Sequence, residues 1–239
     1  MKKLIIALLF ALPAAVMASE GGHYEKANID LADKASLQRG AKLFVNYCLS
    51  CHSAAFQRYN RMGKDIGLTD AQVKDNLMLA AEKVGETMTI AMPHEEAKRW
   101  FGNPPPDLTV MARARGADYI YTYLKSFYID PSRPFGVNNA VFKDVGMPNI
   151  LWELEGQKKA IIKTEGEQTV ITGYEMVKPG KMDEKEFDQA ARDLTNFLVY
   201  TAEPIKLKRQ HVGIWVLLFL SVLFVVAFAL KKEYWKDIH

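Results

Sequence analysis

The only two cysteines of the chain lie three residues apart, in the segment Cys48-Leu-Ser-Cys51-His52. CxxCH is the attachment signature of c-type haem, in which each thiol forms a thioether with one haem vinyl group. The adjacent histidine is then delivered to the iron as an axial ligand. A thioredoxin-like redox pair is the main alternative, but no βαβ pattern surrounds Cys48. We therefore predict one covalently attached haem c, with His52 as the proximal ligand.

The second axial ligand must come from elsewhere in the chain. His94 is an isolated histidine, a type that is more often a surface residue than a ligand. A methionine thioether is a soft ligand that favours ferrous iron and raises the potential. Met92 and Met147 each precede a proline in a loop, which would fix the direction of the sulfur. Met147 is the better candidate because Gly146 permits close approach of the backbone to the haem face. Met92 and His94 remain alternatives.

The N-terminus indicates export. Lys2 and Lys3 precede an apolar run, and Ala18 ends a segment suited to signal peptidase. Residues 1–18 are therefore predicted to be a signal peptide, with an uncleaved anchor as the alternative. Covalent haem attachment is completed outside the bacterial cytoplasm, so the leader and the CxxCH motif predict the same compartment. Both cysteines are used for haem, and none is left for a disulfide.

A second apolar run lies near the C-terminus. Residues 212–230 carry no charge and, at about 1.5 Å per helical residue, match a bilayer core of about 30 Å. A buried core helix is the alternative. We predict a transmembrane anchor over 211–231, a periplasmic domain over 19–210 and a cytoplasmic tail over 232–239. The protein would be a single-pass component of the bacterial inner membrane.

Charge excludes one class of partner. Without Lys2 and Lys3 the chain has 29 basic and 28 acidic residues, from totals of 31 and 28. This balance gives no indication of nucleic-acid binding. The exported part has the size of one domain.

The periodicity of apolar residues predicts a mainly helical domain. Helices are expected over 36–47, 70–84, 107–114, 117–128 and 184–201, and a short one with Pro93 at its first position. Ser36 is a plausible N-cap of the first helix. Capping boxes are expected at Thr69 with Gln72, and at Asp183 with Glu186. Residues 159–177 indicate a β-hairpin.

The first and last of these helices are expected to cross. Gly40 and Phe44 lie one turn apart, so a small residue next to an aromatic would let another helix approach closely. Leu194 and Phe197 are the expected partners. This plan is that of class I c-type cytochromes. The predicted fold is a mainly α, class I cytochrome c-like haem domain with an inserted middle section and a small β-hairpin, plus one C-terminal transmembrane helix.

Several segments together resemble the cytochrome c1 family, the haem subunits of ubiquinol–cytochrome c reductase (bc1) complexes, and most closely its proteobacterial form. They are RGAKLFVNYCLSCHS at 39–53, PPDLTVMARARGADYIYTYL at 105–124, VGMPN at 145–149 and DLTNFLVYTAEP at 193–204, together with the signal peptide and the anchor. The PPDL segment and the AEP ending before the anchor are much more specific than CxxCH alone.

The resemblance implies roles for individual residues. Cys48 and Cys51 would attach the haem, and His52 and Met147 would be its axial ligands. Arg115 and Tyr119 match an arginine and a tyrosine that bind a haem propionate in the family, although the spacing here is shorter than in mitochondrial relatives. Pro105 and Pro106 would pack against the haem edge.

The resemblance also implies an electron carrier that is not an enzyme on its own. It would take one electron from the Rieske iron–sulfur subunit and pass it to a soluble cytochrome c, in a complex that also contains cytochrome b. A membrane-anchored monohaem cytochrome serving a terminal oxidase is the runner-up. A peroxidase, which needs an open sixth site, and a non-redox structural subunit are more distant alternatives.

Overall fold

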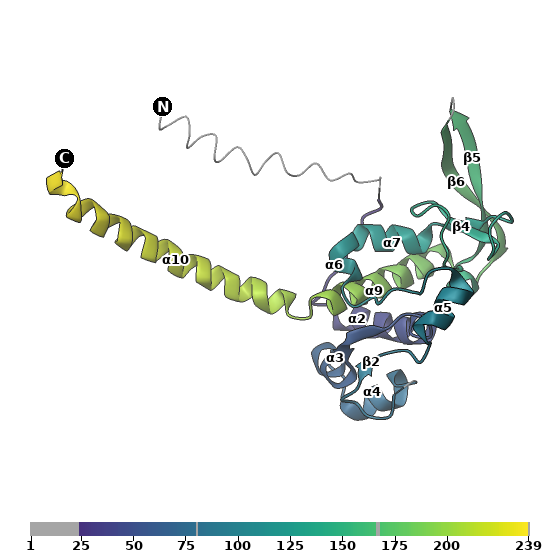
Figure 1. Cartoon of the computed structure of the whole chain (residues 1–239), viewed down its shortest axis with the longest axis horizontal. Helices are drawn as coiled ribbons and strands as arrows, with labels where there is room; N and C mark the ends of the chain where they lie inside the picture. The colour runs from purple at the N-terminus through teal and green to yellow at the C-terminus, as the bar shows by residue number, and fades with distance from the viewer. Residues whose placement is uncertain (1–23, 80, 166–167, 239) are drawn as a thin grey trace.

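The computed structural model describes residues 24–79, 81–165 and 168–238. The predicted signal peptide, residues 1–18, lies outside this part of the chain. A helical domain is followed by one long C-terminal helix, and a β-hairpin projects from the domain (Figure 1). The mainly α fold with small two-stranded sheets is as predicted.

Helix α2 (Lys34–Leu43) leads directly into the haem motif. It continues as one π-helical turn, η2 (Phe44–Cys48), which ends at the first cysteine. The predicted N-cap is wrong: the Asp33 carboxylate accepts the Ser36 N–H at 3.0 Å and caps the helix. The Ser36 hydroxyl is buried and accepts a hydrogen bond from the Asn196 amide at 3.0 Å. Its oxygen therefore serves a tertiary contact.

Helix α9 (Glu184–Ala202) packs against α2, as expected. It begins at the predicted capping box of Asp183 and Glu186. A Cβ added to Gly40 would lie 2.1 Å from the backbone oxygen of Asp193, so the two helices touch at this glycine. The rings of Phe44 and Phe197 pack 5.5 Å apart beside it. This contact lies in the core that also holds Cys48.

The segment after the haem motif forms β1 (Ala54–Arg58), α3 (Tyr59–Ile66), α4 (Asp70–Leu77) and β2 (Thr87–Met88), with β1 and β2 antiparallel. The capping box of Thr69 and Gln72 is confirmed. The helix, however, ends at Leu77, well before the predicted end at 84. The Asn60 N–H donates to the Val84 oxygen at 2.7 Å, which holds that part of the chain against α3 and out of the helix.

Three short helices form the middle of the domain. Helix α5 (His94–Phe101) starts after Pro93, which is its N-cap and not its first helical residue. Helices α6 (Met111–Arg115) and α7 (Ala117–Lys125) are separated by Gly116, whose φ is +87°. Residues 107–110 are not helical as predicted, because the Asp107 carboxylate accepts the N–H groups of Thr109 and Ala55, each at 2.8 Å.

The remaining strands follow α7, which ends before the predicted residue 128. Strand β3 (Phe127–Ile129) pairs antiparallel with β4 (Val137–Asn139). After α8 (Trp152–Glu155), strands β5 (Gly156–Glu165) and β6 (Gln168–Pro179) form the predicted hairpin, which is longer than 159–177. The base of the hairpin is joined to the domain by Lys158, whose amine donates to the backbone oxygen of Lys125.

Helix α10 (Lys206–Tyr234) contains the predicted anchor and is followed by the short helix η3 (Lys236–Ile238). It begins five residues before the predicted boundary, because the helix continues into the polar segment before the apolar run. Its most apolar stretch is not buried at all against the rest of the described chain. By length and composition this helix could cross a membrane.

Candidate haem site

The haem motif occupies the turn that closes η2. The N–H groups of Cys51 and His52 donate to the backbone oxygen of Cys48, at 3.0 and 2.8 Å. Cys48 is buried and Cys51 is partly exposed. One tight turn therefore carries both thiols and the imidazole.

The His52 ring is oriented by a backbone group. Its Nδ1 lies 2.8 Å from the carbonyl oxygen of Pro106. A carbonyl can only accept, so Nδ1 carries the proton and Nε2 keeps a free lone pair. Burial lowers the pKa of His52 below its ordinary value, against the opposing effects of the Pro106 carbonyl and of Asp107. A neutral imidazole with its second nitrogen held by an acceptor is the form that binds iron.

The two thiols are not joined to each other. Burial, with a smaller contribution from Cys51, raises the pKa of the Cys48 thiol to about 12. Within the described residues, Cys, His and acidic side chains form no cluster that could hold a bare metal ion. The chemistry of this donor set, two free thiols and one oriented imidazole, fits a haem held by thioethers.

The PPDL segment lies next to residues 53–55, which directly follow the haem motif. The Leu108 N–H donates to the Ser53 oxygen at 2.8 Å, and Asp107 holds the Ala55 N–H. Pro105 is half-buried and Pro106 is exposed. What the sequence did not indicate is that the Pro106 carbonyl orients His52.

Met147 lies on a loop that is held by the strand before it. The Asn138 side chain accepts the N–H of Asp144 at 2.9 Å, and Arg133 donates to the backbone oxygen of Asp144, also at 2.9 Å. Asp144 has a φ of +61°, a left-handed conformation that reverses the chain ahead of Val145. The buried Asn138 and the Arg133 side chain thus shape this loop.

The Met147 sulfur has a polar neighbour that sequence reasoning missed. The Tyr123 hydroxyl donates to it across 3.3 Å. Burial raises the pKa of Tyr123 far above its ordinary value, so the hydroxyl keeps its proton. The only sequence signal was the four-residue spacing from Tyr119 on the same helix, and the two rings stack 6.1 Å apart.

Arg115 and Tyr119 lie close together, as binding of the same propionate would require. The Arg115 guanidinium carbon lies 5.5 Å from the centre of the Tyr119 ring. Arg115 is exposed and Tyr119 is half-buried. A cation and a hydroxyl on neighbouring helices are suitable partners for one carboxylate.

Half-buried apolar side chains complete the fit. They pack against the core that contains Cys48, and among them are Ile90, Leu108, Met111, Tyr119, Tyr123 and Ile150. Such a surface suits a flat apolar macrocycle better than it suits water. The residues present therefore fit a haem.

The rival ligands lie in different surroundings. His94 is the first residue of α5, its side chain is 73% exposed, and its Nδ1 lies 3.7 Å from Glu95. Met92 is half-buried just before α5, and no polar contact to its sulfur occurs among the described residues.

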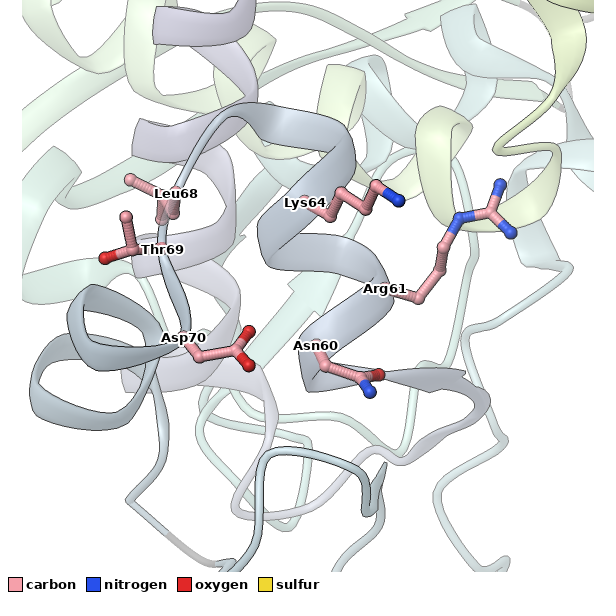
Figure 2. Close-up of a pocket in the computed structure, with 6 residues that line it drawn as sticks. All are labelled: Asn60, Arg61, Lys64, Leu68, Thr69 and Asp70. Atoms are coloured by element: carbon pink, nitrogen blue, oxygen red, sulfur yellow. The ribbon is translucent and has the colours of Figure 1, made fainter.

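A shallow surface depression of about 540 Å³ lies between α3 and the start of α4 (Figure 2). Arg61 on its edge is paired with Asp65 at 2.6 Å. Its described lining contains no aromatic side chain and none of the predicted haem residues: it consists of Asn60, Arg61, Lys64, Leu68, Thr69 and Asp70. This depression is not the haem site.

Comparison with known proteins gives strong matches along the chain. "Cytochrome c1" of Allochromatium vinosum is 50% identical over 244 residues, and the match covers 100% of both chains. "Ammonia monooxygenase gamma subunit" of Nitrosomonas europaea is 45% identical, over 100% of this chain and 98% of its own. "Cytochrome c1" of Rhodospirillum rubrum is 27% identical, over 97% and 94%.

The family model described as "Cytochrome C1 family" matches residues 24–238. That range includes the CxxCH turn, the PPDL segment, the Met147 loop and α10. It also spans all of the described residues. The chain belongs to the cytochrome c1 family.

Proposed function

We propose that this chain is the electron-transfer haem subunit of a ubiquinol–cytochrome c reductase. It would accept one electron from a Rieske iron–sulfur subunit and deliver it to a soluble cytochrome c. Family membership implies a haem cofactor. The observation that carries the proposal is the His52 ring, whose Nδ1 proton is held by Pro106 and whose Nε2 is free within a CxxCH turn.

Different residues would attach the haem, bind its iron and bind its propionate. Cys48 and Cys51 would attach a single haem c through two thioethers, and His52 and Met147 would fill both axial positions. The haem supplies a one-electron ferric/ferrous couple. If His52 and Met147 both hold the iron, it would have no position left for a substrate, which favours electron transfer over peroxidase chemistry. Arg115 and Tyr119 would bind a propionate, and Pro105 and Pro106 would pack at the haem edge.

The membrane arrangement is part of the proposal. Residues 19–210 would form a periplasmic domain, 211–231 would cross the inner membrane and 232–239 would lie in the cytoplasm. The supporting observation is α10, whose uncharged apolar stretch is not buried against the described part of the domain. Anchoring keeps the haem close to the quinol-oxidising subunits, cytochrome b and the Rieske protein.

Copurification tests the proposal directly. The affinity-tagged full chain, extracted in mild detergent, should bring down a cytochrome b and a Rieske protein in constant ratio, and quinol should reduce its haem in that preparation. Recovery with a terminal oxidase would support the runner-up. The name of the Nitrosomonas relative defines another outcome: recovery with ammonia monooxygenase subunits and without cytochrome b would overturn the assignment.

A further inference from the structure

We propose that Tyr123 is a positioning residue for the sixth iron ligand. Its hydroxyl holds the Met147 sulfur and withdraws electron density from it, which raises the reduction potential of the haem. This inference rests on the proposed function, because it takes Met147 as the distal ligand. It adds a residue that the CxxCH, PPDL and VGMPN motifs do not include.

The contact itself is specific. The Tyr123 oxygen lies 3.3 Å from the Met147 sulfur, and the described part of the chain offers that hydroxyl no other hydrogen-bond partner. A thioether sulfur is a weak acceptor with two lone pairs. One pair can accept the hydroxyl proton while the other remains for the iron. The hydrogen bond is therefore compatible with ligation.

The Tyr123 ring is not free to turn away. Tyr119 stacks on it with the ring planes 13° apart, and Phe127 packs edge-on against it at 5.2 Å. Aromatic neighbours therefore pack against the ring on two sides. These contacts aim the hydroxyl at the Met147 sulfur.

Asn139 joins the helix of Tyr123 to the loop of Met147. Its side-chain N–H donates to the Tyr123 backbone oxygen at 2.8 Å, and its side-chain oxygen accepts the N–H groups of Val141 and Phe142 at 2.9 and 3.1 Å. Asn139 is 1% exposed. One buried amide therefore connects the start of the ligand loop to the end of α7, which carries the donor.

The direction of the effect follows from charge. Ferric iron depends more than ferrous iron on electron donation from its ligands. A hydrogen bond to the sulfur lowers that donation, so it destabilises the ferric state relative to the ferrous state. Losing the hydroxyl should then lower the potential while the sulfur stays on the iron.

The test compares two tyrosines of α7 in the haem-loaded full chain. Tyr123→Phe removes only the hydroxyl and should lower the reduction potential. The weak near-red absorption band that a methionine sulfur gives when bound to ferric haem should persist. Tyr121→Phe is the matched control, because the Tyr121 hydroxyl bonds Asp188 and not the sulfur. It should leave the potential unchanged. Equal shifts in both variants, or no shift in Tyr123→Phe, would overturn the proposal.

A double-mutant cycle separates this inference from the ligand assignment. In a Met147→Leu background the Tyr123→Phe change should no longer shift the potential, because its acceptor is gone. A shift of the same size there would mean that the hydroxyl acts through general polarity, and the proposal would fail. If Met147→Leu alone kept the near-red band, the ligand assignment would be wrong, whatever Tyr123→Phe does.

Discussion

Each of the two proposed iron ligands of this chain is held by one hydrogen bond with another residue. The Pro106 carbonyl holds His52 at 2.8 Å, and the Tyr123 hydroxyl holds Met147 at 3.3 Å. Both partners belong to the polypeptide, so the chain itself contributes to the orientation of the two side chains. Orientation in advance reduces the ordering that haem binding must impose.

At the residue scale, the Met147 assignment predicts a spectroscopic loss. Met147→Leu keeps the apolar volume and removes the sulfur. It should abolish the near-red band of the ferric haem, lower the potential and open the ferrous iron to carbon monoxide. Met92→Leu is the control and should change none of these. The opposite pattern would make Met92 the ligand, a band kept in both variants would indicate another methionine, and a band already absent from the unaltered protein would favour His94.

A second prediction at this scale concerns Arg115. Arg115→Ala removes a cation proposed to lie at a propionate, so the ferric state should gain relative stability and the potential should fall. Because Arg115 is exposed, the shift should be small and should shrink at high salt, since the Debye length falls from about 10 Å at 0.1 M to about 3 Å at 1 M. Arg113→Ala, on the same helix, is the control. An unchanged or higher potential in Arg115→Ala at low salt would count against the propionate role.

At the scale of elements, stability depends on the contact of α2 with α9. Any side chain at Gly40 would meet its neighbours too closely, because its Cβ would lie 2.1 Å from the Asp193 backbone oxygen and 2.7 Å from the Phe197 Cβ. Gly40→Ala should therefore force the helices apart and lower the free energy of unfolding by about 1–3 kcal/mol or more. Denaturant titration followed by haem absorption in detergent measures this.

The matched control for Gly40 is Gly85→Ala. Nothing lies within 4 Å of a Cβ at Gly85, and its φ is not in the left-handed region. Its cost should stay within about 0.5 kcal/mol. A Gly40→Ala variant as stable as Gly85→Ala would show that α2 and α9 can separate without loss.

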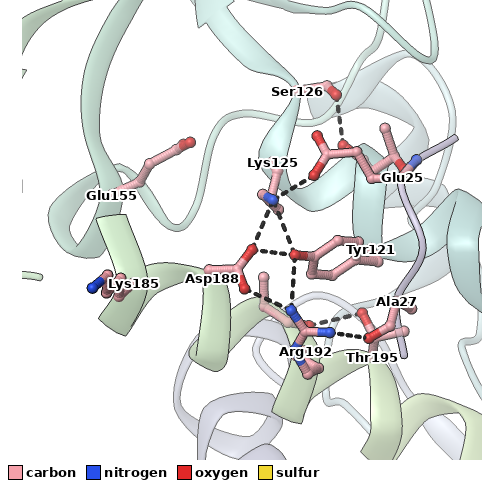
Figure 3. A network of polar contacts seen from close by, with 12 residues as sticks. Glu25, Ala27, Tyr121, Lys125, Ser126, Glu155, Lys185, Asp188, Arg192 and Thr195 are labelled. Carbon is pink, nitrogen blue, oxygen red and sulfur yellow. Dashed lines mark hydrogen bonds and ion pairs between the residues drawn. The ribbon is translucent and has the colours of Figure 1, made fainter. Parts of the chain in front are cut away.

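Residues 25–27, ahead of α2, are tied to α7 and α9 by a polar network (Figure 3). The Lys125 amine donates to Glu25 at 2.6 Å and to Asp188 at 2.8 Å. Arg192 donates to the other Asp188 oxygen at 2.7 Å and to the backbone oxygen of Ala27 at 2.6 Å. Burial alone would raise the pKa of Asp188, but the hydrogen bonds from Lys125, Tyr121 and Arg192 outweigh it and hold the pKa well below its ordinary value.

That depressed pKa predicts how stability varies with pH. The ionised Asp188 contributes stability that is fully present above its unfolded-state pKa of about 3.9 and is lost as pH falls toward the folded-state value. Asp188→Asn should lower the free energy of unfolding by about 1–2 kcal/mol at neutral pH. The difference from the unaltered chain should stay constant from pH 7 to about 5 and shrink below about 4. A difference that grew on acidification would contradict the network.

At the scale of the whole molecule, we predict that α10 and the domain are separable, because the apolar stretch of α10 is not buried against the described part of the domain. Truncation after Gln210 removes the apolar run and leaves the α2–α9 core and the Met147 loop intact. The shortened chain, expressed with its leader, should fractionate as a soluble protein with the haem spectrum of the full chain. If it remained with salt-washed membranes when expressed alone, another membrane element would have to exist within residues 1–210.

The elements that the sequence predicted well are those with local signals. The capping boxes at Thr69 and Asp183, the final helix and the hairpin appear where expected. Three of the failures share one cause. Ser36 does not cap α2, α4 stops at Leu77, and residues 107–110 are not helical, and in each case a hydrogen-bonding group is taken by a residue distant in sequence. A prediction made from a short stretch of sequence cannot include partners that lie so far away along the chain.

The same division holds for the site. The amino-acid sequence by itself determined the chemistry: two thiols and an imidazole within one turn, a methionine in a Gly-Met-Pro loop, and an apolar run long enough for a bilayer, all of which are properties of neighbouring residues. Only the tertiary structure decided which nitrogen of His52 is free and which hydroxyl meets the Met147 sulfur. Those contacts join residues 54 and 24 positions apart, and only the packing of the core brings them within hydrogen-bonding distance.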